Sequence, residues 1–430
     1  MNDTARPHPF RVHNFRAYWL SRLAMTLGGY AMMLIIGWQT YNIARDAGMT
    51  IPEASGQLAL IGLLQFLPLF VSTPFSGLAA DRFERRALGR LTILLQLGCA
   101  AVLAWATGTG AISLPILFTV AIVLGIARGF AGPALSALAP NLVPKAILPT
   151  AIALSSIAWQ VGMIGGPALG GYLFAIEPHL PYTVAAGLFA LSATALTFIG
   201  TVPQPAVRRD QRPIGAIIDG LRYVVNNKMV LGAITLDLAA VFLAGATALF
   251  PVYARDILEV GETGLSQLAM APAVGAAITA AWFSFRPIRS DVGPKMLGAV
   301  AVFGLATIVF GLSTSMPLSL AMLFIVGAAD MFSVYIRQSL IQLHTPDDKR
   351  GRVSSVSLLT ISASNEGGDF FSGTLAFLIG PVAAVVAGGA GAVATVALWA
   401  RLFPVLVTTK TFDPPPDLLE GHQQKDTQEA

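Results

Sequence analysis

Two acidic residues, Glu366 and Asp369, stand three positions apart in a stretch of mainly small and apolar residues. At this spacing both carboxylates fall on one face of a helix. Carboxylates that close tend to share a proton, because a second negative charge beside the first is disfavoured. The pair is therefore our first candidate for a proton-coupling site, and Asp237, which also lies in an apolar stretch, is the next.

Four further charged residues in apolar stretches are candidates for lining a substrate cavity: Arg22, Arg128, Asp330 and Arg337. Charges in such surroundings are costly, so they are functional candidates by default. The three arginines could attract an acidic substrate. Alternatively, the acids only neutralise the arginines, and Arg128 makes a structural bond to a neighbouring helix.

Nothing in the sequence indicates an enzyme. The single cysteine, Cys99, lies in an apolar stretch where we expect it to pack, and no phosphate-binding glycine loop precedes a lysine. The histidines lack the spacing of metal ligands; they are His8, His13, His179, His344 and His422. We therefore expect no catalytic residue, no metal and no cofactor.

The elements that hold these charges are predicted to be membrane-spanning helices. Of the 430 residues, 55% are hydrophobic and only 12% are charged, a composition far from that of soluble domains. Apolar windows of about 20 residues, the length that crosses a hydrocarbon core of about 30 Å, recur along the chain. The expected spans are 17–42, 57–79, 88–108, 113–138, 147–175, 181–201, 229–254, 264–285, 295–313, 317–340, 353–379 and 381–406. This predicts an all-α membrane protein with twelve transmembrane helices.

The basic residues predict the orientation of these helices, because cytoplasmic loops retain Lys and Arg. With the N-terminus inside, nearly all basic residues between the spans fall on the cytoplasmic side, and only Arg45 and Arg255 fall on the other. Both termini are then cytoplasmic, and the positive net charge reflects topology rather than nucleic-acid binding. Residues 1–16 are polar and basic, so we expect no cleavable signal peptide.

A Pro- and Arg-rich segment divides the spans into six and six. In its second part, apolar residues share one helical face that Arg222 and Lys228 flank, which is typical of a helix lying in the membrane interface. These residues are Ile214, Ile217, Ile218, Leu221, Val224 and Val225. The expected order is a cytoplasmic N-terminal tail, an N-terminal half, a cytoplasmic linker, a C-terminal half and a disordered cytoplasmic tail, at 1–16, 17–201, 202–228, 229–406 and 407–430 respectively.

An internal repeat favours two related halves. Residues 127–173, shifted by 202 positions onto 329–375, match at nine of 47 positions. The shift places Arg128 opposite Asp330, so that opposite charges occupy equivalent positions. Two related halves around a cavity are a common plan of transporters.

The fifth span reads GMIGGPALGG at 162–171, although each interior glycine costs a helix about 0.5–1 kcal/mol relative to alanine. In a membrane, small residues let two helix backbones approach closely. We therefore expect close packing of this span against its counterpart in the other half, with a bend around a central cavity at the proline. The residues of this helix-packing motif are Gly162, Gly166, Pro167, Gly170 and Gly171.

Three motifs resemble the major facilitator superfamily, and the resemblance covers essentially the whole chain. GLAADRFERR at 77–86 is similar to the signature G-x-x-x-D-R-x-G-R-R, with Glu84 in place of the second glycine. RGFAG at 128–132 is similar to R-x-x-x-G, and the glycine motif of the fifth span matches that of drug and proton antiporters. Stretches at 14–24, 231–258 and 330–373 resemble the enterobactin (siderophore) exporter branch more closely.

The resemblance implies two pseudo-symmetric six-helix halves that work by alternating access, with the close packing of the fifth span helping to seal or rock the cavity. It also implies a conformational latch after the second span, in which Asp81 faces the positive N-terminal end of the eleventh span near Gly351 and Arg352. In the alternative, the arginines of this loop only set topology. The latch residues are Gly77, Asp81, Arg82, Arg85 and Arg86.

Taken with the apolar composition, the resemblance implies a monomeric, proton-coupled antiporter in the cytoplasmic (inner) membrane of a bacterium. Its expected partners are a small-molecule substrate, the proton and the lipid bilayer, and the expected substrate of export is a siderophore or a related amphiphilic metabolite. The first alternative is a multidrug or antibiotic efflux protein of the same superfamily. The second is a non-enzymatic membrane scaffold.

Overall fold

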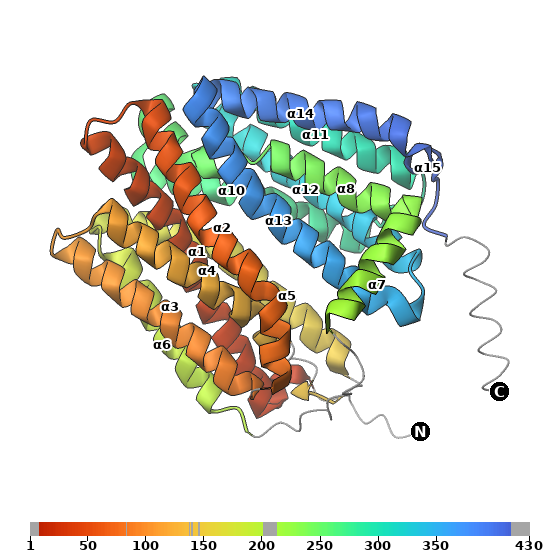
Figure 1. Ribbon diagram of the computed structural model, residues 1–430, viewed down its shortest axis with the longest axis horizontal. Helices are drawn as coiled ribbons and strands as arrows, with labels where there is room; N and C mark the ends of the chain where they lie inside the picture. The colour runs from red at the N-terminus through yellow and green to blue at the C-terminus, as the bar shows by residue number, and fades with distance from the viewer. Residues whose placement is uncertain are drawn as a thin grey trace. The chain divides into compact units, whose positions relative to one another are not determined.

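The computed structural model describes residues 8–82, 84–136, 138, 141–144, 147–200 and 213–413. These residues form helices and connecting turns, with no strand among them (Figure 1). Eleven of the described helices are long and apolar enough to cross a membrane. The remaining expected span is α13 (Asp347–Ile379), a helix of 33 residues that carries Glu366 and Asp369. The all-α fold with twelve long helices is therefore confirmed.

The chain forms two compact units, of which the first comprises Met1–Asp210 and Thr247–Ala273. Within it, α1 packs against α5 and α6, α2 packs against α4, and α3 packs against α4 and α6. After a short 3-10 turn η1 (Pro9–Arg11), its long helices are α1 (His13–Asp46), α2 (Ile51–Arg82), α3 (Arg85–Gly108), α4 (Leu114–Ser136), α5 (Leu148–Ile176) and α6 (Leu180–Thr197).

The second unit comprises Gln211–Ala246 and Val274–Ala430. In it, α11 packs against α12 and α14, while α13 packs against α7, α8 and α14. Its helices, besides α13 and the second part of α10 (Gly261–Phe285), are α7 (Pro213–Asn226), α8 (Lys228–Leu243), α11 (Val292–Leu312), α12 (Met316–Leu343), α14 (Pro381–Leu402) and α15 (Pro404–Thr408).

The seventh expected span, 229–254, is not one continuous helix. Helix α8 ends at Leu243, and residues 244–246 are not helical. Gly245 lies so close to α13 that a Cβ atom there would come within 2.9 Å of the backbone carbon of Gly368. The chain then continues through short turns that belong to the first unit: η4 (Thr247–Leu249), α9 (Phe250–Val252) and the π-helix η5 (Tyr253–Ile257).

Local sequence explains where several helices begin. Thr50 and Glu53 form a capping box before α2: the Thr50 amide donates to Glu53 Oε2 at 2.7 Å, and the Glu53 amide donates to Thr50 Oγ1 at 3.4 Å. The Asn227 side chain accepts hydrogen bonds from two amides at the start of α8. Between α13 and α14 a single residue, Gly380, turns the chain with φ +87°.

The surface of the helices is strongly apolar. Phe285 is 84% exposed and Trp105 is 64% exposed, and many other large apolar side chains also point away from the protein. Water would make this arrangement unfavourable, whereas a hydrocarbon solvent covers such side chains at no cost. The exposed side chains therefore fit a protein that is surrounded by lipid.

Helix α7 carries the apolar residues that we expect on one face of an interfacial helix, and this expectation stays a prediction. Val224 is 2% exposed and packs within the second unit, whereas Ile218, Leu221 and Val225 are each about half exposed. Close approach explains the burial of Val224, because a Cβ atom on Gly220 would lie 2.9 Å from the carbonyl oxygen of Arg352 on α13. The side chains of Ile214 and Ile217 lie outside those that the structure describes.

Candidate functional site

A cavity in the first unit is lined by side chains from α1 to α5. Its polar wall consists of Gln65 on α2, Gln96 on α3 and Arg128 on α4. Tyr30 on α1 and Trp159 on α5 form an aromatic wall, with ring centroids 6.4 Å apart and ring planes at 72°. The other lining residues are Met25, Thr26, Gly29, Met32, Met33, Leu124, Ala131 and Gly132.

Two glycines on α4 bring Arg128 to this cavity. A Cβ atom on Gly125 would collide with the carbonyl oxygen of Gln65, and one on Gly129 would collide with the Ser72 hydroxyl. Because both positions lack a side chain, α4 lies directly against the backbone of α2. Arg128 Nη1 lies 3.5 Å from Gln65 Oε1, at the outer limit of a hydrogen bond.

The charge of the cavity is positive. Among the described lining residues, Arg128 is the one charged side chain. Guanidinium groups bind carboxylate and other planar anions, and the methionine and aromatic side chains offer apolar surface beside it. The arrangement can therefore bind an amphiphile that carries a negative group or hydrogen-bond acceptors.

The helix-packing motif of the fifth span contacts α1 of the same unit, which corrects our expectation of contact with its counterpart in the other half. A Cβ atom on Gly166 would lie 2.5 Å from Tyr30 Cβ and 3.0 Å from the Leu27 carbonyl oxygen. Gly162 and Gly170 likewise face Thr26 and Ala31 on α1. The spacing therefore identified a close-packing face, and the partner is the neighbouring helix that carries one cavity wall.

The last part of this motif contacts α10. Gly171 faces Ser266, and the Ser266 hydroxyl donates a hydrogen bond of 2.9 Å to the carbonyl oxygen of Pro167. Pro167 lies inside α5 as expected from the sequence. The motif thus joins α5 to two neighbouring helices within the first unit.

Arg22 lies on α1, one turn before the lining residue Thr26. Its Nη1 donates to the Tyr18 hydroxyl at 3.4 Å, whereas its buried Nε has no hydrogen-bond partner in the described part of the chain. An unsatisfied buried donor is unfavourable. Arg22 is not among the residues that line the cavity, but its position one turn from Thr26 places a positive charge near the cavity.

Two of the predicted charged residues form a pair in the second unit. Arg337 on α12 forms an ion pair with Asp237 on α8, and both side chains are almost fully buried. Asp330 lies two turns before Arg337 on the same helix, α12. For Asp237 this is the neutralising arrangement that we considered as an alternative to proton coupling.

Glu366 and Asp369 both lie partly buried on α13. Between them, Gly367 and Gly368 pack on α8: a Cβ atom on Gly368 would lie 3.0 Å from the Val241 carbonyl oxygen. The two acids therefore flank a close helix–helix contact. Their role in proton coupling stays a prediction.

The structure describes only part of the predicted latch. Helix α2 extends through Arg82, but the side chains of Gly77, Asp81 and Arg82 lie outside those that the structure describes. Arg85 begins α3 and is partly buried.

Arg86 has partners within the first unit. It forms an ion pair with Glu84, the residue that replaces the second signature glycine, and its Nη1 donates to the carbonyl oxygen of Ile199 after α6. Arg86 therefore ties the start of α3 to the end of α6.

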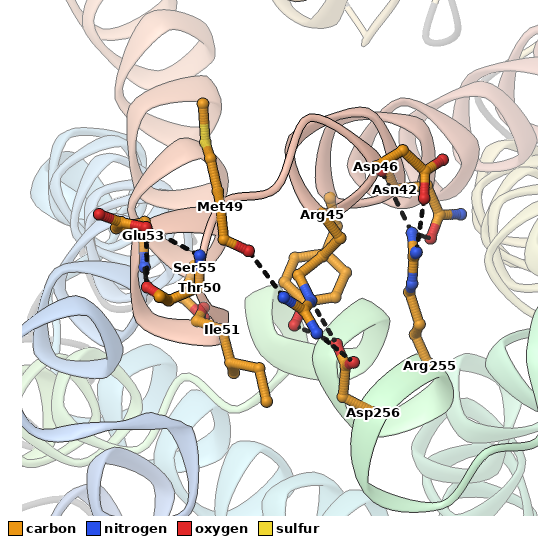
Figure 2. Close-up of polar contacts among 11 residues, drawn as sticks. Asn42, Arg45, Asp46, Met49, Thr50, Ile51, Glu53, Ser55, Arg255 and Asp256 are labelled. Atoms are coloured by element: carbon orange, nitrogen blue, oxygen red, sulfur yellow. Dashed lines mark hydrogen bonds and ion pairs between the residues drawn. The ribbon is translucent and has the colours of Figure 1, made fainter.

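A cluster of charged residues at the end of α1 was missed in the sequence. There, Arg45 and Asp46 meet Asp256 and Arg255 of η5 (Figure 2). The sequence indicated Arg45 and Arg255 only as exceptions to the topology pattern. The available signal was that each is followed by aspartate in the same tripeptide, Ala-Arg-Asp.

Comparison with known proteins supports the interpretation of these helices. The sequence model of the Major Facilitator Superfamily matches residues 18–365. The multidrug efflux pump Tap of Mycobacterium tuberculosis is 28% identical over 350 residues, which cover 78% of this chain and 78% of Tap. The enterobactin exporter EntS of Shigella dysenteriae is 25% identical over 401 residues, which cover 90% of each chain.

Solved structures agree on the fold. A bacterial homologue of the human lysosomal transporter Spinster, in an inward-facing and occupied conformation, aligns with a TM-score of 0.71 at 15% identity. The alignment covers 94% of this chain and all of the homologue. A D-xylose–proton symporter aligns with a TM-score of 0.67 at 13% identity, over 90% of this chain and 98% of the symporter.

Proposed function

The chain belongs to the Major Facilitator Superfamily of membrane transporters, and from this premise we propose that it exports a siderophore of the enterobactin type or a related amphiphilic metabolite. Transport is by alternating access and is coupled to protons. The protein acts as a monomer in the cytoplasmic membrane of a bacterium, with both termini in the cytoplasm.

The observation that carries this proposal is the cavity of the first unit. Arg128 supplies a positive charge, Gln65 and Gln96 supply amide groups, and Tyr30 and Trp159 supply aromatic surface. Catecholate and carboxylate siderophores combine aromatic or apolar parts with anionic oxygens. The similarity to EntS over 90% of the chain supports the same class of substrate.

A second candidate is multidrug efflux, which is the function named for the relative Tap. Met25, Met32 and Met33 favour this alternative, because flexible thioether side chains adapt to ligands of different shape. A drug-susceptibility panel distinguishes the two, since a multidrug pump changes resistance to several unrelated compounds.

Mass spectrometry of intracellular and secreted siderophore, in iron-starved cells with and without this gene, tests the proposal. We expect the deletion to raise the intracellular pool and deplete the secreted one. Wild type and an Arg401→Gln control on the exposed end of α14 restore secretion, whereas Arg128→Gln does not. Unchanged pools on deletion would contradict siderophore export and shift the assignment to drug efflux.

Proton coupling is tested by three single amide variants, Glu366→Gln, Asp369→Asn and Asp237→Asn, measured in vesicles with an imposed proton gradient. We expect at least one of them to lose accumulation of substrate against its gradient while retaining exchange at equal concentrations. Asp413→Asn, an exposed acid near the C-terminal end, is the matched control. Uphill transport by all three variants would exclude coupling through these carboxylates.

A further inference from the structure

The turn between α10 and α11 carries exposed basic side chains next to exposed aromatic ones. Helix α10 ends at Phe285, and α11 begins at Val292. The side chains of Trp282 and Phe285 are 58% and 84% exposed. Arg286 and Arg289 follow in the turn and are exposed as well. Apolar surface therefore borders directly on positive charge at this place in the second unit.

The length of α11 places this turn at the level of the lipid headgroups. A helix of 21 residues is about 31 Å long, close to the hydrocarbon thickness of about 30 Å. Its first residue, Val292, therefore lies near one boundary of the hydrocarbon. Lys295 lies further along the helix, and its Nζ donates a 2.7 Å hydrogen bond back to the carbonyl oxygen of Ser290. A lysine that reaches back toward the headgroups in this way is typical of a membrane interface.

Aromatic and apolar packing holds the turn in place. The ring of Phe283, which is 6% exposed, stacks on Tyr335 of α12 with the centroids 4.5 Å apart. Tyr335 in turn contacts Phe412 of the C-terminal segment, with the centroids 6.3 Å apart and the ring planes at 88°. Ile288 packs on the same apolar cluster. The chain is therefore anchored on both sides of Arg286.

The C-terminal segment brings a further basic residue to the turn. The Val292 amide donates to the carbonyl oxygen of Lys410 at 3.3 Å, and the Gly293 amide donates to that of Thr409 at 3.0 Å. Gly293 permits this approach, because a Cβ atom there would collide with the carbonyl oxygen of Leu406. Helix α15 packs against α11 next to this contact (Figure 1). The exposed side chain of Lys410 therefore adds positive charge beside the turn.

The Arg286 guanidinium is well placed to bind an anion. Its Cζ lies 5.6 Å from the centroid of the Trp282 ring, in a cation–π contact. Such a contact uses the face of the guanidinium and leaves the N–H groups at its edge for a phosphate, whose geometry they match. In the part of the chain that the structure describes, no carboxylate forms an ion pair with Arg286, Arg289 or Lys410.

The acids of these segments do not cancel the positive charge. Asp291 is exposed in the turn, and Asp413 accepts a 2.6 Å hydrogen bond from the Thr411 hydroxyl. Residues 282–295 and 404–413 together contain four basic side chains and two acidic ones, which leaves two positive charges in excess. The amides of Val292 and Gly293 are already bound, so side chains must supply the contacts to any anion.

We propose that the turn between α10 and α11 binds the headgroup of an anionic phospholipid. Arg286, Arg289 and Lys410 surround its phosphate, and Trp282 and Phe285 lie along its acyl chains. Charge complementarity selects this occupant, because a zwitterionic lipid carries its own cation next to the phosphate. The exposed aromatic side chains at the hydrocarbon boundary favour a lipid over a soluble anion. This inference holds whichever substrate the protein exports.

Native mass spectrometry of the full chain in detergent measures the binding directly. Phosphatidylglycerol and phosphatidylcholine with the same acyl chains are titrated separately. We expect the first phosphatidylglycerol to bind about tenfold more tightly, the factor that one hydrogen bond between charged groups supplies. Arg286→Gln with Arg289→Gln should lower this affinity about tenfold. The charge-matched control is Arg11→Gln with Arg16→Gln, which removes two exposed arginines of the first unit and should leave the affinity unchanged.

Two further variants separate lipid binding from damage to the fold. Arg286→Lys with Arg289→Lys keeps both charges and should retain most of the affinity. Lys410→Gln should weaken phosphatidylglycerol binding without changing the unfolding temperature in lipid-free detergent, because its carbonyl still accepts the bond from α11.

Four results would overturn the proposal. The first is equal affinity for the two lipids, and the second is wild-type affinity in the double glutamine variant of the turn or in Lys410→Gln. The third is an equal loss in that double variant and in the charge-matched control, because positive charge anywhere on the protein would then suffice. The fourth is displacement of the lipid by soluble glycerol 3-phosphate, because the site would then take a free anion.

Discussion

The buried ion pair between Asp237 and Arg337 allows a quantitative test of the second unit. We consider three variants: Asp237→Asn, Arg337→Met and the two combined. Both side chains are less than 10% exposed, at 7% for Asp237 and 4% for Arg337. We therefore expect the loss of folding free energy typical of a broken buried pair, about 3–5 kcal/mol. A surface pair contributes only roughly 0–1 kcal/mol.

Asp330 makes the two single variants unequal. It lies two turns before Arg337 on the same helix, α12. When Asp237 is neutralised, Asp330 still offers a carboxylate on the helix of Arg337, so we expect a loss near the lower end, about 3 kcal/mol. When Arg337 is replaced by methionine, two acids remain without their cation, so we expect a loss near about 5 kcal/mol. The double variant should cost less than the sum of the two, because no charge of the pair is left unpaired.

Unfolding by denaturant in detergent micelles, followed by tryptophan fluorescence, gives the free energies. Asp219→Asn is the matched control, because Asp219 pairs with Arg352 at 3.6 Å and the two side chains are 55% and 34% exposed. Its loss should stay below about 1 kcal/mol. The reasoning is refuted if Asp237→Asn costs no more than this control, or if it costs more than Arg337→Met. Transport by the double variant would further show that Asp237 neutralises Arg337 and carries no proton.

Two further variants test the packing motif and the latch. Gly166→Leu should abolish transport while leaving membrane abundance largely intact, because even a Cβ atom at position 166 would press against Tyr30. Gly187→Leu is the control and should transport normally, because a Cβ atom at position 187 meets no atom within 4 Å. Equal transport by both glycine variants would contradict the role of close packing. Asp81→Asn should impair transport without reversing topology, as measured by export assays and by labelling of loop cysteines, and a fully active variant would argue against a latch.

Most of the long helices could be predicted because a span must be apolar over most of its length, and hydropathy records this directly. The break at 244–246 could not be predicted, because Ala244, Gly245 and Ala246 are as apolar as their neighbours. Only the structure shows that Gly368 of α13 lies against the chain where the helix ends. Similarly, the four-residue spacing of glycines on α5 identifies a packing face but not the helix that covers it.

The candidate site was only partly visible in the sequence. Arg128, Asp237 and Arg337 are conspicuous because charges are rare within apolar stretches. The pairing of Asp237 with Arg337 joins positions one hundred residues apart, which no local pattern records. The partners of Arg45 and Arg255 were hidden because a charge at the end of a span is unremarkable by itself. Only the repeated Ala-Arg-Asp tripeptide distinguished them.

The glycines of the first unit also determine how its cavity can change shape. Gly125 and Gly129 join α4 to α2 backbone to backbone, while Gly162, Gly166 and Gly170 join α5 to α1. We therefore expect each pair of helices to move together. Much of the polar wall belongs to one body and the aromatic wall to the other. A ligand that contacts both walls would restrict the movement of one helix pair relative to the other. Binding in the cavity should therefore make the whole unit more rigid.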